Sequence, residues 1–193
     1  MELIITTNHS SDPGPVRELH LNRPPANALS PELIVALREA VEAAPKDGAR
    51  ALVLSGGPGM FSAGLDVPLL VALDRPAIAA AWRELYSLMR ALACSPIPIA
   101  AAITGHGPAG GTVLALFCDW RGMAEGDWKM GFNEVQVGIP LPPVILSAHG
   151  EEQMKALLPQ VHVDLIRNHT ANGLGIGHEE HMLVRSARKR DAV

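Results

Sequence analysis

Apolar and polar positions along the chain follow two periods, and each period predicts a type of secondary structure. A helix is predicted to start after Ser30, whose hydroxyl suits an N-cap, with Pro31 at its first position. Its apolar residues recur at helical spacing and predict one buried face: Leu33, Ile34, Leu37 and Val41. The same spacing over residues 76–93 predicts a second helix, with a buried stripe of Ile78, Trp82, Leu85, Met89 and Leu92.

Short apolar runs outside these helices predict strands. Residues 3–6 and 16–21 are predicted to pair as a hairpin, because residues 8–15 between them are rich in turn-forming residue types. Buried strands are predicted at 51–54 and 98–103, and a strand edge at 128–132. Strands that alternate with helices indicate an α/β fold with crossover connections.

Two glycine-marked segments each follow an apolar run and lead into a helix-like segment. The first is Phe61-Ser62-Ala63-Gly64-Leu65-Asp66, in which Asp66 can cap a short helix. The second is Gly105-His106-Gly107-Pro108-Ala109-Gly110-Gly111, which precedes an apolar helix reaching about Cys118. Both are predicted to be loops with exposed N–H groups, since glycine permits close approach and the first N–H groups of a helix lack internal acceptors. Two such donors on one oxygen form an oxyanion hole, whereas the alternative interpretation is a pair of ordinary turns.

One carboxylate fits the role of a base for such a site. Glu134 lies among apolar neighbours in Gly131-Phe132-Asn133-Glu134-Val135, where partial desolvation disfavours its charged form and suits a general base near neutral pH. The alternative interpretation is a solvated or salt-bridged glutamate. We therefore expect chemistry carried by backbone dipoles and one base.

Other kinds of catalytic site find little support in the sequence. Ser62 lacks the Gly-x-Ser-x-Gly elbow of serine hydrolases. The histidines of His178-Glu179-Glu180-His181 do not have zinc-protease spacing, so no metal site is expected. His106 is expected on the surface of the second loop, and Asp119 and Arg121 are expected to form a structural pair.

Composition and charge narrow the function further. The 193 residues fit one domain with a real core, and the net charge of −4 argues against an electrostatic nucleic-acid binder. Cys94 and Cys118 lie in apolar segments and are expected to be buried free thiols in a reducing compartment, the alternative being a disulfide. The sequence shows no signal peptide and no apolar stretch of the ~20 residues needed to span a bilayer. We therefore expect a cytoplasmic protein with no membrane partner.

Several of these motifs together resemble the enoyl-CoA hydratase/isomerase (crotonase) family. The resemblance extends over roughly residues 16–146, in matching order and spacing. The motifs that carry it are Leu21-Asn22-Arg23-Pro24, Asn27-Ala28-Leu29-Ser30, Phe61-Ser62-Ala63-Gly64-Leu65-Asp66, Pro108-Ala109-Gly110-Gly111, Leu114-Ala115-Leu116 and Cys118-Asp119. The resemblance implies a crotonase-like spiral of ββα units that binds acyl-CoA thioesters and assembles as a homotrimer or hexamer. It also implies a role in fatty acid metabolism, specifically β-oxidation.

The resemblance also implies roles for individual residues. The N–H groups of Leu65 and Gly110 would hold the thioester carbonyl, and Glu134 would be the catalytic base. The remaining residues implied to bind substrate are Ala26 and Ala28 along the coenzyme A moiety, Ala63, Gly64, Asp66 and Val67 at the acyl thioester, and Asn133. Coenzyme A enters as part of the substrate, and no cofactor or metal is implied.

Carboxylates decide which reaction the resemblance implies. Hydratases of this family use two glutamates, and at the position of the first this chain has Val113, while Glu134 matches the second. The pair Asn133-Glu134, together with Pro108-Ala109-Gly110-Gly111, is instead similar to the Δ3,Δ2-enoyl-CoA isomerases, in which one glutamate suffices. The expected function is an enoyl-CoA isomerase. The alternatives are a weakly active or inactive acyl-CoA-binding protein, an enoyl-CoA hydratase and a thioester hydrolase.

The resemblance stops near His149 and divides the chain into two parts. Residues 1–148 are predicted to form the crotonase-like core, and residues 149–193 an atypical, short C-terminal tail. Members of the family usually continue with helices that cover the active site and build the trimer. Two explanations fit the tail: a divergent replacement of those helices, or an altered reading frame.

Overall fold

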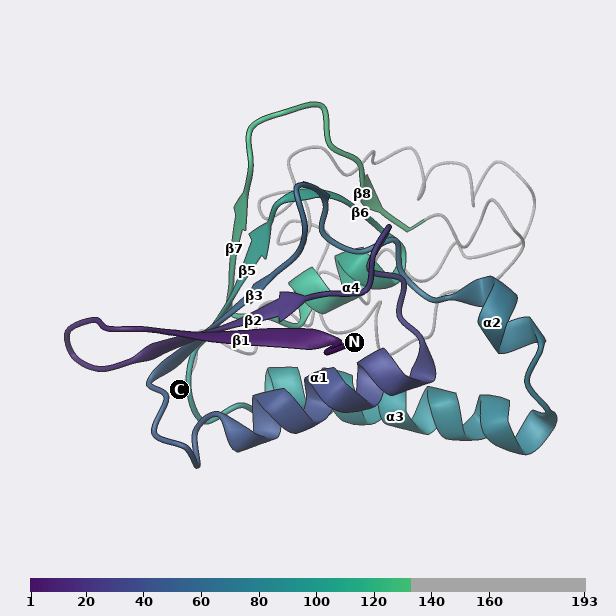
Figure 1. Ribbon diagram of the computed structural model, residues 1–193, viewed down its shortest axis with the longest axis horizontal. Coiled ribbons are helices and arrows are strands. Elements are labelled where there is room, and N and C mark those ends of the chain that lie inside the picture. Colours follow the sequence, from purple (N-terminus) through teal and green to yellow (C-terminus); the bar gives the residue numbers. More distant parts are fainter. Residues whose placement is uncertain (133–193) are drawn as a thin grey trace, which may run out of the picture. The chain divides into compact units, whose positions relative to one another are not determined.

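The computed structural model describes residues 1–132 of the chain (Figure 1). Its residues fall into two compact units, Met1–Trp128 and Lys129–Val193. All the helices and strands discussed below belong to the first unit, except the short strand β8 (Met130–Gly131) in the second. The predicted boundary between residues 148 and 149 lies outside the described residues.

A five-stranded sheet is the largest element of the first unit. Its strands are β1 (Ile4–His9), β2 (Val16–Leu21), β3 (Ala51–Ser55), β5 (Ile99–Ile103) and β7 (Trp120–Met123), in the order β1-β2-β3-β5-β7. The predicted hairpin is present as the antiparallel pair β1–β2, with Ile4 opposite Leu21. The other pairs are parallel, as crossover connections require. Only β7 was not predicted.

Two long helices, α1 (Pro31–Ala43) and α3 (Arg75–Ala93), lie side by side, and α1 packs against β1 of the sheet (Figure 1). α1 begins as predicted, because the Ser30 hydroxyl accepts a hydrogen bond from Leu33 N. Its buried residues are the four predicted ones. The buried face of α3 differs from the prediction: Ile78 and Trp82 are only half-buried, and the buried residues are Ala81, Leu85, Leu88, Met89 and Leu92.

A second, smaller pair of parallel strands joins the two glycine-marked segments. It consists of β4 (Gly59–Met60) and β6 (Gly105–Pro108), so the prediction that residues 105–108 form a loop is wrong. The glycine serves close strand packing here, because a Cβ on Gly105 would lie 2.0 Å from the Gly59 carbonyl carbon. The short helices α2 (Val67–Val71) and α4 (Gly110–Leu116) follow the two segments.

The order of elements repeats a ββα unit three times within residues 1–132. The units are β1–β2–α1, then β3–β4 followed by α2 and α3, then β5–β6–α4. This repetition is the predicted spiral and confirms the α/β class. The longest described helix is α3, and no helix in residues 1–132 is long and apolar enough to cross a membrane.

The two cysteines have different environments. Cys94, at the C-terminus of α3, is exposed, so the prediction of burial is wrong there. Cys118 is buried as predicted, and burial raises the pKa of its thiol to about 12, which leaves it protonated and unreactive.

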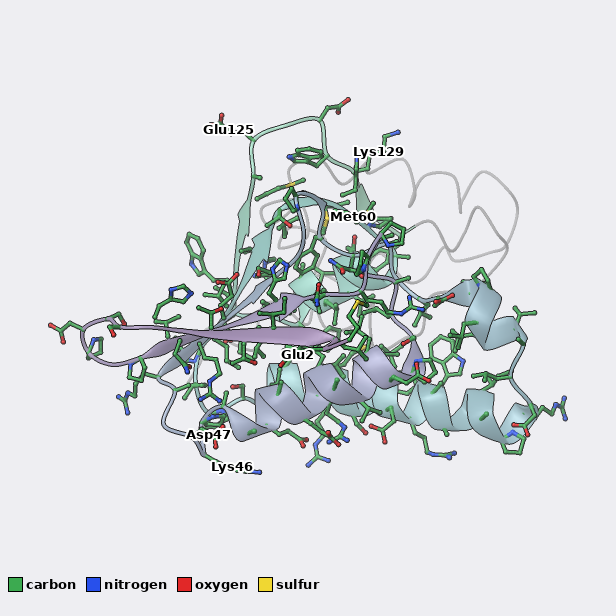
Figure 2. The ribbon with its side chains drawn as sticks, in the orientation of Figure 1. Glu2, Lys46, Asp47, Met60, Glu125 and Lys129 are labelled. Atoms are coloured by element: carbon green, nitrogen blue, oxygen red, sulfur yellow. The ribbon has the colours of Figure 1, made fainter. Side chains whose placement is uncertain are left out.

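Charged side chains such as Lys46, Asp47 and Glu125 lie on turns at the outside of the ribbon (Figure 2).

Candidate active site

The first glycine-marked segment directs a backbone N–H away from its neighbouring strand. Gly64 has a φ of +83°, a conformation that glycine adopts without steric cost. It leads into a parallel bridge in which Leu29 N donates to Gly64 O (2.7 Å) and Asp66 N donates to Leu29 O (3.1 Å). Because those bonds use the residues on either side of Leu65, the N–H of Leu65 itself faces away from Leu29.

The second segment presents an N–H at the start of α4. Gly110 is the first residue of that helix, so its N–H has no acceptor within the helix. Ala109 before it has a φ of +49° and turns the chain sharply from β6 into α4. Every residue of α4 is buried, so the packing on all sides fixes the position of its first N–H.

The structure brings these two donors together. A Cβ on Gly64 would lie 2.7 Å from Gly110 N, and a Cβ on Gly110 would lie 3.3 Å from Leu65 N. A side chain on Gly64 would force the segments to shift, and one on Gly110 would fit only tightly. Among residues 1–132, neither the Leu65 N–H nor the Gly110 N–H donates a hydrogen bond. The arrangement can therefore offer two backbone donors to one oxygen.

Gly111 holds the two segments at this distance. A Cβ there would lie 2.4 Å from Ser62 O, so a side chain would push α4 away from the first segment. Ser62 is fully buried, and its hydroxyl donates to Asn27 O (2.8 Å) while accepting from Gly64 N (3.2 Å). This environment supports the exclusion of Ser62 as a nucleophile.

The loop implied to contact coenzyme A is fastened to the first segment. Arg23 forms a 2.6 Å ion pair with Asp66 and donates to Ala28 O (3.0 Å). Ala63 N donates to Ala26 O (2.9 Å). The residues Ala26, Ala28, Ala63, Gly64 and Asp66 therefore lie in one connected region.

Sequence reasoning gave no role to Arg23 or Asn27, which hold this region together. The Asn27 side chain accepts from Arg23 N (2.9 Å) and donates to Phe61 O (3.2 Å). Its φ of +48° is one that asparagine tolerates better than most residues. The motifs contain both polar residues, which was the available signal. Their distant partners, Asp66 for Arg23 and Phe61 O for Asn27, cannot be identified from a local sequence pattern.

The Asp66 carboxylate has two partners. It accepts from Leu69 N (3.2 Å) as the predicted N-cap of α2 and also pairs with Arg23. Val67, the first residue of α2, is 51% exposed. Of the remaining candidates, Glu134 and Asn133 lie outside the described residues.

Arg121 closes the other end of α4. Its guanidinium donates to Ala115 O (3.1 Å), Leu116 O (3.3 Å) and Cys118 O, at the end of the helix where carbonyls lack regular helical acceptor bonds. Ala115 O also accepts from Cys118 N (3.3 Å). Burial lowers the pKa of this group. The expected pair with Asp119 is not formed, because the Asp119 carboxylate accepts from Ile99 N (2.8 Å) and Arg121 contacts only the Asp119 carbonyl.

We expect Arg121→Met to lower the free energy of unfolding by about 1.5–3 kcal/mol, since it removes charge-assisted hydrogen bonds to the carbonyls at the end of α4. Arg121→Lys should lose less, because one ammonium still reaches part of the carbonyl set. Urea denaturation measures both. Arg83→Met on the exposed side of α3 is the control, and equal stability of the two Met variants would contradict this role.

His106 is not on a loop. It lies in β6, half-buried, with its ring edge-on to Trp128 at 5.2 Å between centroids. The expectation of a loop surface is therefore wrong. The described residues contain no group of three or more His, Cys, Asp or Glu side chains that could hold a metal ion.

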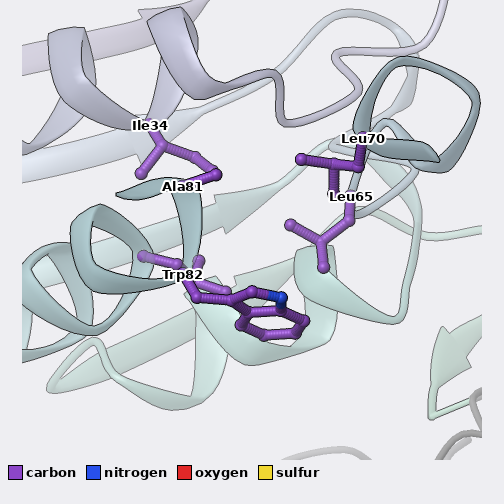
Figure 3. A pocket seen from close by; sticks show the side chains of 6 residues that line it. Ile34, Leu65, Leu70, Ala81 and Trp82 are labelled. Carbon is purple, nitrogen blue, oxygen red and sulfur yellow. The ribbon is translucent and has the colours of Figure 1, made fainter. Parts of the chain in front are cut away.

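A small apolar recess adjoins the paired donors (Figure 3). Leu65 lines it with its side chain, while its N–H is one of the two donors. The complete lining is Ile34 from α1, Leu65, Leu70 from α2, and Ala81, Trp82 and Leu85 from α3. Figure 3 shows Leu65 pointing toward the ring of Trp82. The recess offers an apolar surface beside the point where an oxygen would be bound.

Comparison with known proteins gives this arrangement a family context. A sequence model of the enoyl-CoA hydratase/isomerase family matches residues 12–149. The mitochondrial enoyl-CoA delta isomerase 1 of Mus musculus is 35% identical over 133 residues, 67% of this chain and 46% of that protein. A probable enoyl-CoA hydratase, EchA17, of Mycobacterium tuberculosis H37Rv is 36% identical over 140 residues, 70% of this chain and 52% of that protein. The chain thus spans about half the length of these relatives.

Solved structures agree on the fold. Human mitochondrial delta3-delta2-enoyl-CoA isomerase superposes with a TM-score of 0.74 at 25% identity, covering 99% of this chain and 84% of that one. The enoyl-CoA hydratase EchA3 of Mycobacterium ulcerans superposes with a TM-score of 0.72 at 22% identity, covering 97% and 92%, which bears on the fold alone. The fold is crotonase-like, and the chain belongs to the enoyl-CoA hydratase/isomerase family, with isomerases among its relatives.

Proposed function

We propose that this protein is an enoyl-CoA isomerase that moves a double bond from C3 to C2 of an acyl-CoA thioester. The observation that supports the proposal is that Leu65 N and Gly110 N, from segments far apart in sequence, lie close together and donate to no acceptor within residues 1–132. Such a pair stabilises negative charge on a thioester oxygen as it develops, and acyl-CoA thioesters are the substrates of the family.

The proposed reaction begins with the thioester carbonyl of a 3-enoyl-CoA between these two donors. Glu134 takes a proton from C2, and the electrons of that C–H bond move through the C1–C2 bond onto the carbonyl oxygen. The resulting dienolate keeps its charge against the two N–H groups. The protonated Glu134 then returns the proton at C4, which gives the conjugated 2-enoyl-CoA and restores the base. The proposed reaction uses no cofactor or metal.

A second candidate function is hydration of 2-enoyl-CoA, favoured by the relatives named as probable hydratases. Hydration requires a base to activate water and an acid to protonate the α-carbon. The position at which hydratases of the family carry a further glutamate is Val113, which is buried in α4. An apolar side chain there cannot transfer a proton, so we favour isomerisation by the single remaining glutamate.

Two substrates separate the candidate functions. The purified chain is incubated with a 3-enoyl-CoA and, separately, with a 2-enoyl-CoA, while the absorbance of the conjugated thioester is recorded. An isomerase raises the absorbance from the first and leaves that from the second unchanged. Loss of absorbance from the second indicates hydration instead, release of free coenzyme A thiol indicates thioester hydrolysis, and no change in either assay contradicts the proposed function. In that last case, a rise in melting temperature with coenzyme A would indicate an acyl-CoA-binding protein.

A further inference from the structure

We infer that Trp82 limits the acyl end of the site and restricts the substrate to short acyl chains. The inference rests on the proposed function in one respect, that the thioester carbonyl binds at Leu65 and Gly110. It goes further by assigning the apolar recess beside these donors to the hydrocarbon end of the substrate and by naming the residue that limits its length.

Leu65 connects the carbonyl position to the recess. Its N–H is one of the two donors, and its side chain is part of the lining. An acyl chain begins at the carbonyl carbon, so the carbons next to an oxygen held by Leu65 N–H lie beside the Leu65 side chain. The recess is therefore the apolar surface that those carbons meet first.

The size of the recess limits what it can hold. The space that the centre of a water-sized group can occupy is about 10 Å³, close to the minimum that holds one such group, although the recess is partly open to solvent. All six lining side chains are apolar apart from the Trp82 indole nitrogen, so they offer too few polar partners to hold a water. A terminal methyl group fits this chemistry, whereas a long chain would require the lining to move.

Trp82 is the lining residue that sets this limit. Ile34, Ala81 and Leu85 are buried residues of the helices α1 and α3, and their removal would disrupt the core. Trp82 is only half-buried and carries the largest side chain of the set, with its ring facing Leu65 in Figure 3. Its other neighbour is the ring of Tyr86, at 6.2 Å between centroids, and Tyr86 is 41% exposed. Truncation of Trp82 should therefore enlarge the recess and spare most of the core.

The test measures affinity along a series of saturated acyl-CoAs, from butanoyl through hexanoyl and octanoyl to decanoyl, by titration calorimetry on the full chain. Saturated chains cannot isomerise, so the result does not depend on catalysis. For the natural chain we expect affinity to level off within this series, before decanoyl. For Trp82→Ala we expect it to keep rising, by up to about fourfold for each added methylene that is buried. Turnover of 3-enoyl-CoAs of increasing length should shift in the same direction.

Two further variants make the test specific. Tyr86→Ala removes the neighbouring exposed ring, which does not line the recess, and should keep the natural length profile. Trp82→Phe should give a smaller shift than Trp82→Ala, and it serves as the test if the alanine variant does not fold.

The outcomes distinguish this inference from the proposed function. A shifted affinity profile in a protein that isomerises nothing would support the acyl recess and refute the isomerase. Isomerisation with the same length profile in the natural chain and both folded Trp82 variants would support the isomerase and overturn the role of Trp82. The role of Trp82 is also overturned if no acyl-CoA binds more tightly than coenzyme A itself, because the recess then takes no acyl chain.

Discussion

Glu134→Ala is expected to reduce the rate of isomerisation by about 10²–10⁴-fold, the usual contribution of a general base. Its affinity for coenzyme A thioesters should stay nearly unchanged. The expectation follows from the proposed mechanism, in which one carboxylate both removes the C2 proton and returns it at C4. Without that carboxylate, neither transfer has a partner. The measurement combines steady-state turnover of a 3-enoyl-CoA with calorimetric affinity for a saturated acyl-CoA.

Two variants control for effects that are not catalytic. Glu134→Gln keeps the size and polarity of the side chain but cannot accept the proton, so it should be as inactive as the alanine variant. Glu125→Ala removes an exposed carboxylate, and the recorded contact of Glu125 with Trp128 uses its backbone carbonyl, so this variant should behave as the natural chain. If Glu134→Gln retains turnover close to that of the natural chain, the single-base mechanism is wrong.

Elements that depend on local signals were predictable from the sequence. α1 begins at a serine N-cap followed by proline, and its buried face has the predicted four residues. Asp66 caps α2 as expected, through its bond from Leu69 N. Each of these features is decided by side chains within a few residues of one another, which a sequence pattern contains in full.

Features that depend on distant contacts were not predictable. Residues 105–108 contain glycine and proline and look like a loop, yet they form β6 because Gly105 packs against the backbone of Gly59. Arg121 caps α4 instead of pairing with Asp119, since the Ile99 N–H already occupies that carboxylate. In each case a partner more than about ten residues away decides the outcome, and the local pattern does not name it.

The candidate site combines features that the local sequence predicts with features that depend on distant contacts. The glycine segments indicated exposed amides, and the family resemblance selected Leu65 and Gly110 among them. That the two segments approach within the width of a methyl group follows from packing that no local pattern contains, namely Gly111 against Ser62 O. Because the two segments pack so closely, adding a single methyl group at Gly64 tests the site.

Gly64→Ala is expected to lower turnover by about 10²–10³-fold, the effect of losing one oxyanion donor. The added methyl carbon would lie 2.7 Å from Gly110 N and 2.9 Å from Ala109 Cβ, which is too close for either to remain in place. The methyl group either covers the Gly110 N–H or separates the two segments, and in both cases the donors no longer meet at one oxygen. Turnover number and acyl-CoA affinity, measured separately, should show the loss mainly in turnover.

Gly48→Ala is the matched control for backbone strain. Gly48 has a φ of +88°, close to the +83° of Gly64, but a Cβ there meets nothing within 4 Å. Both substitutions force an alanine into the left-handed region at about 1–2 kcal/mol. A thermal melt should therefore show both variants destabilised by that strain, while only Gly64→Ala loses turnover. If the two folded variants turn over 3-enoyl-CoA at the same rate, the amides of Leu65 and Gly110 do not hold the reacting oxygen.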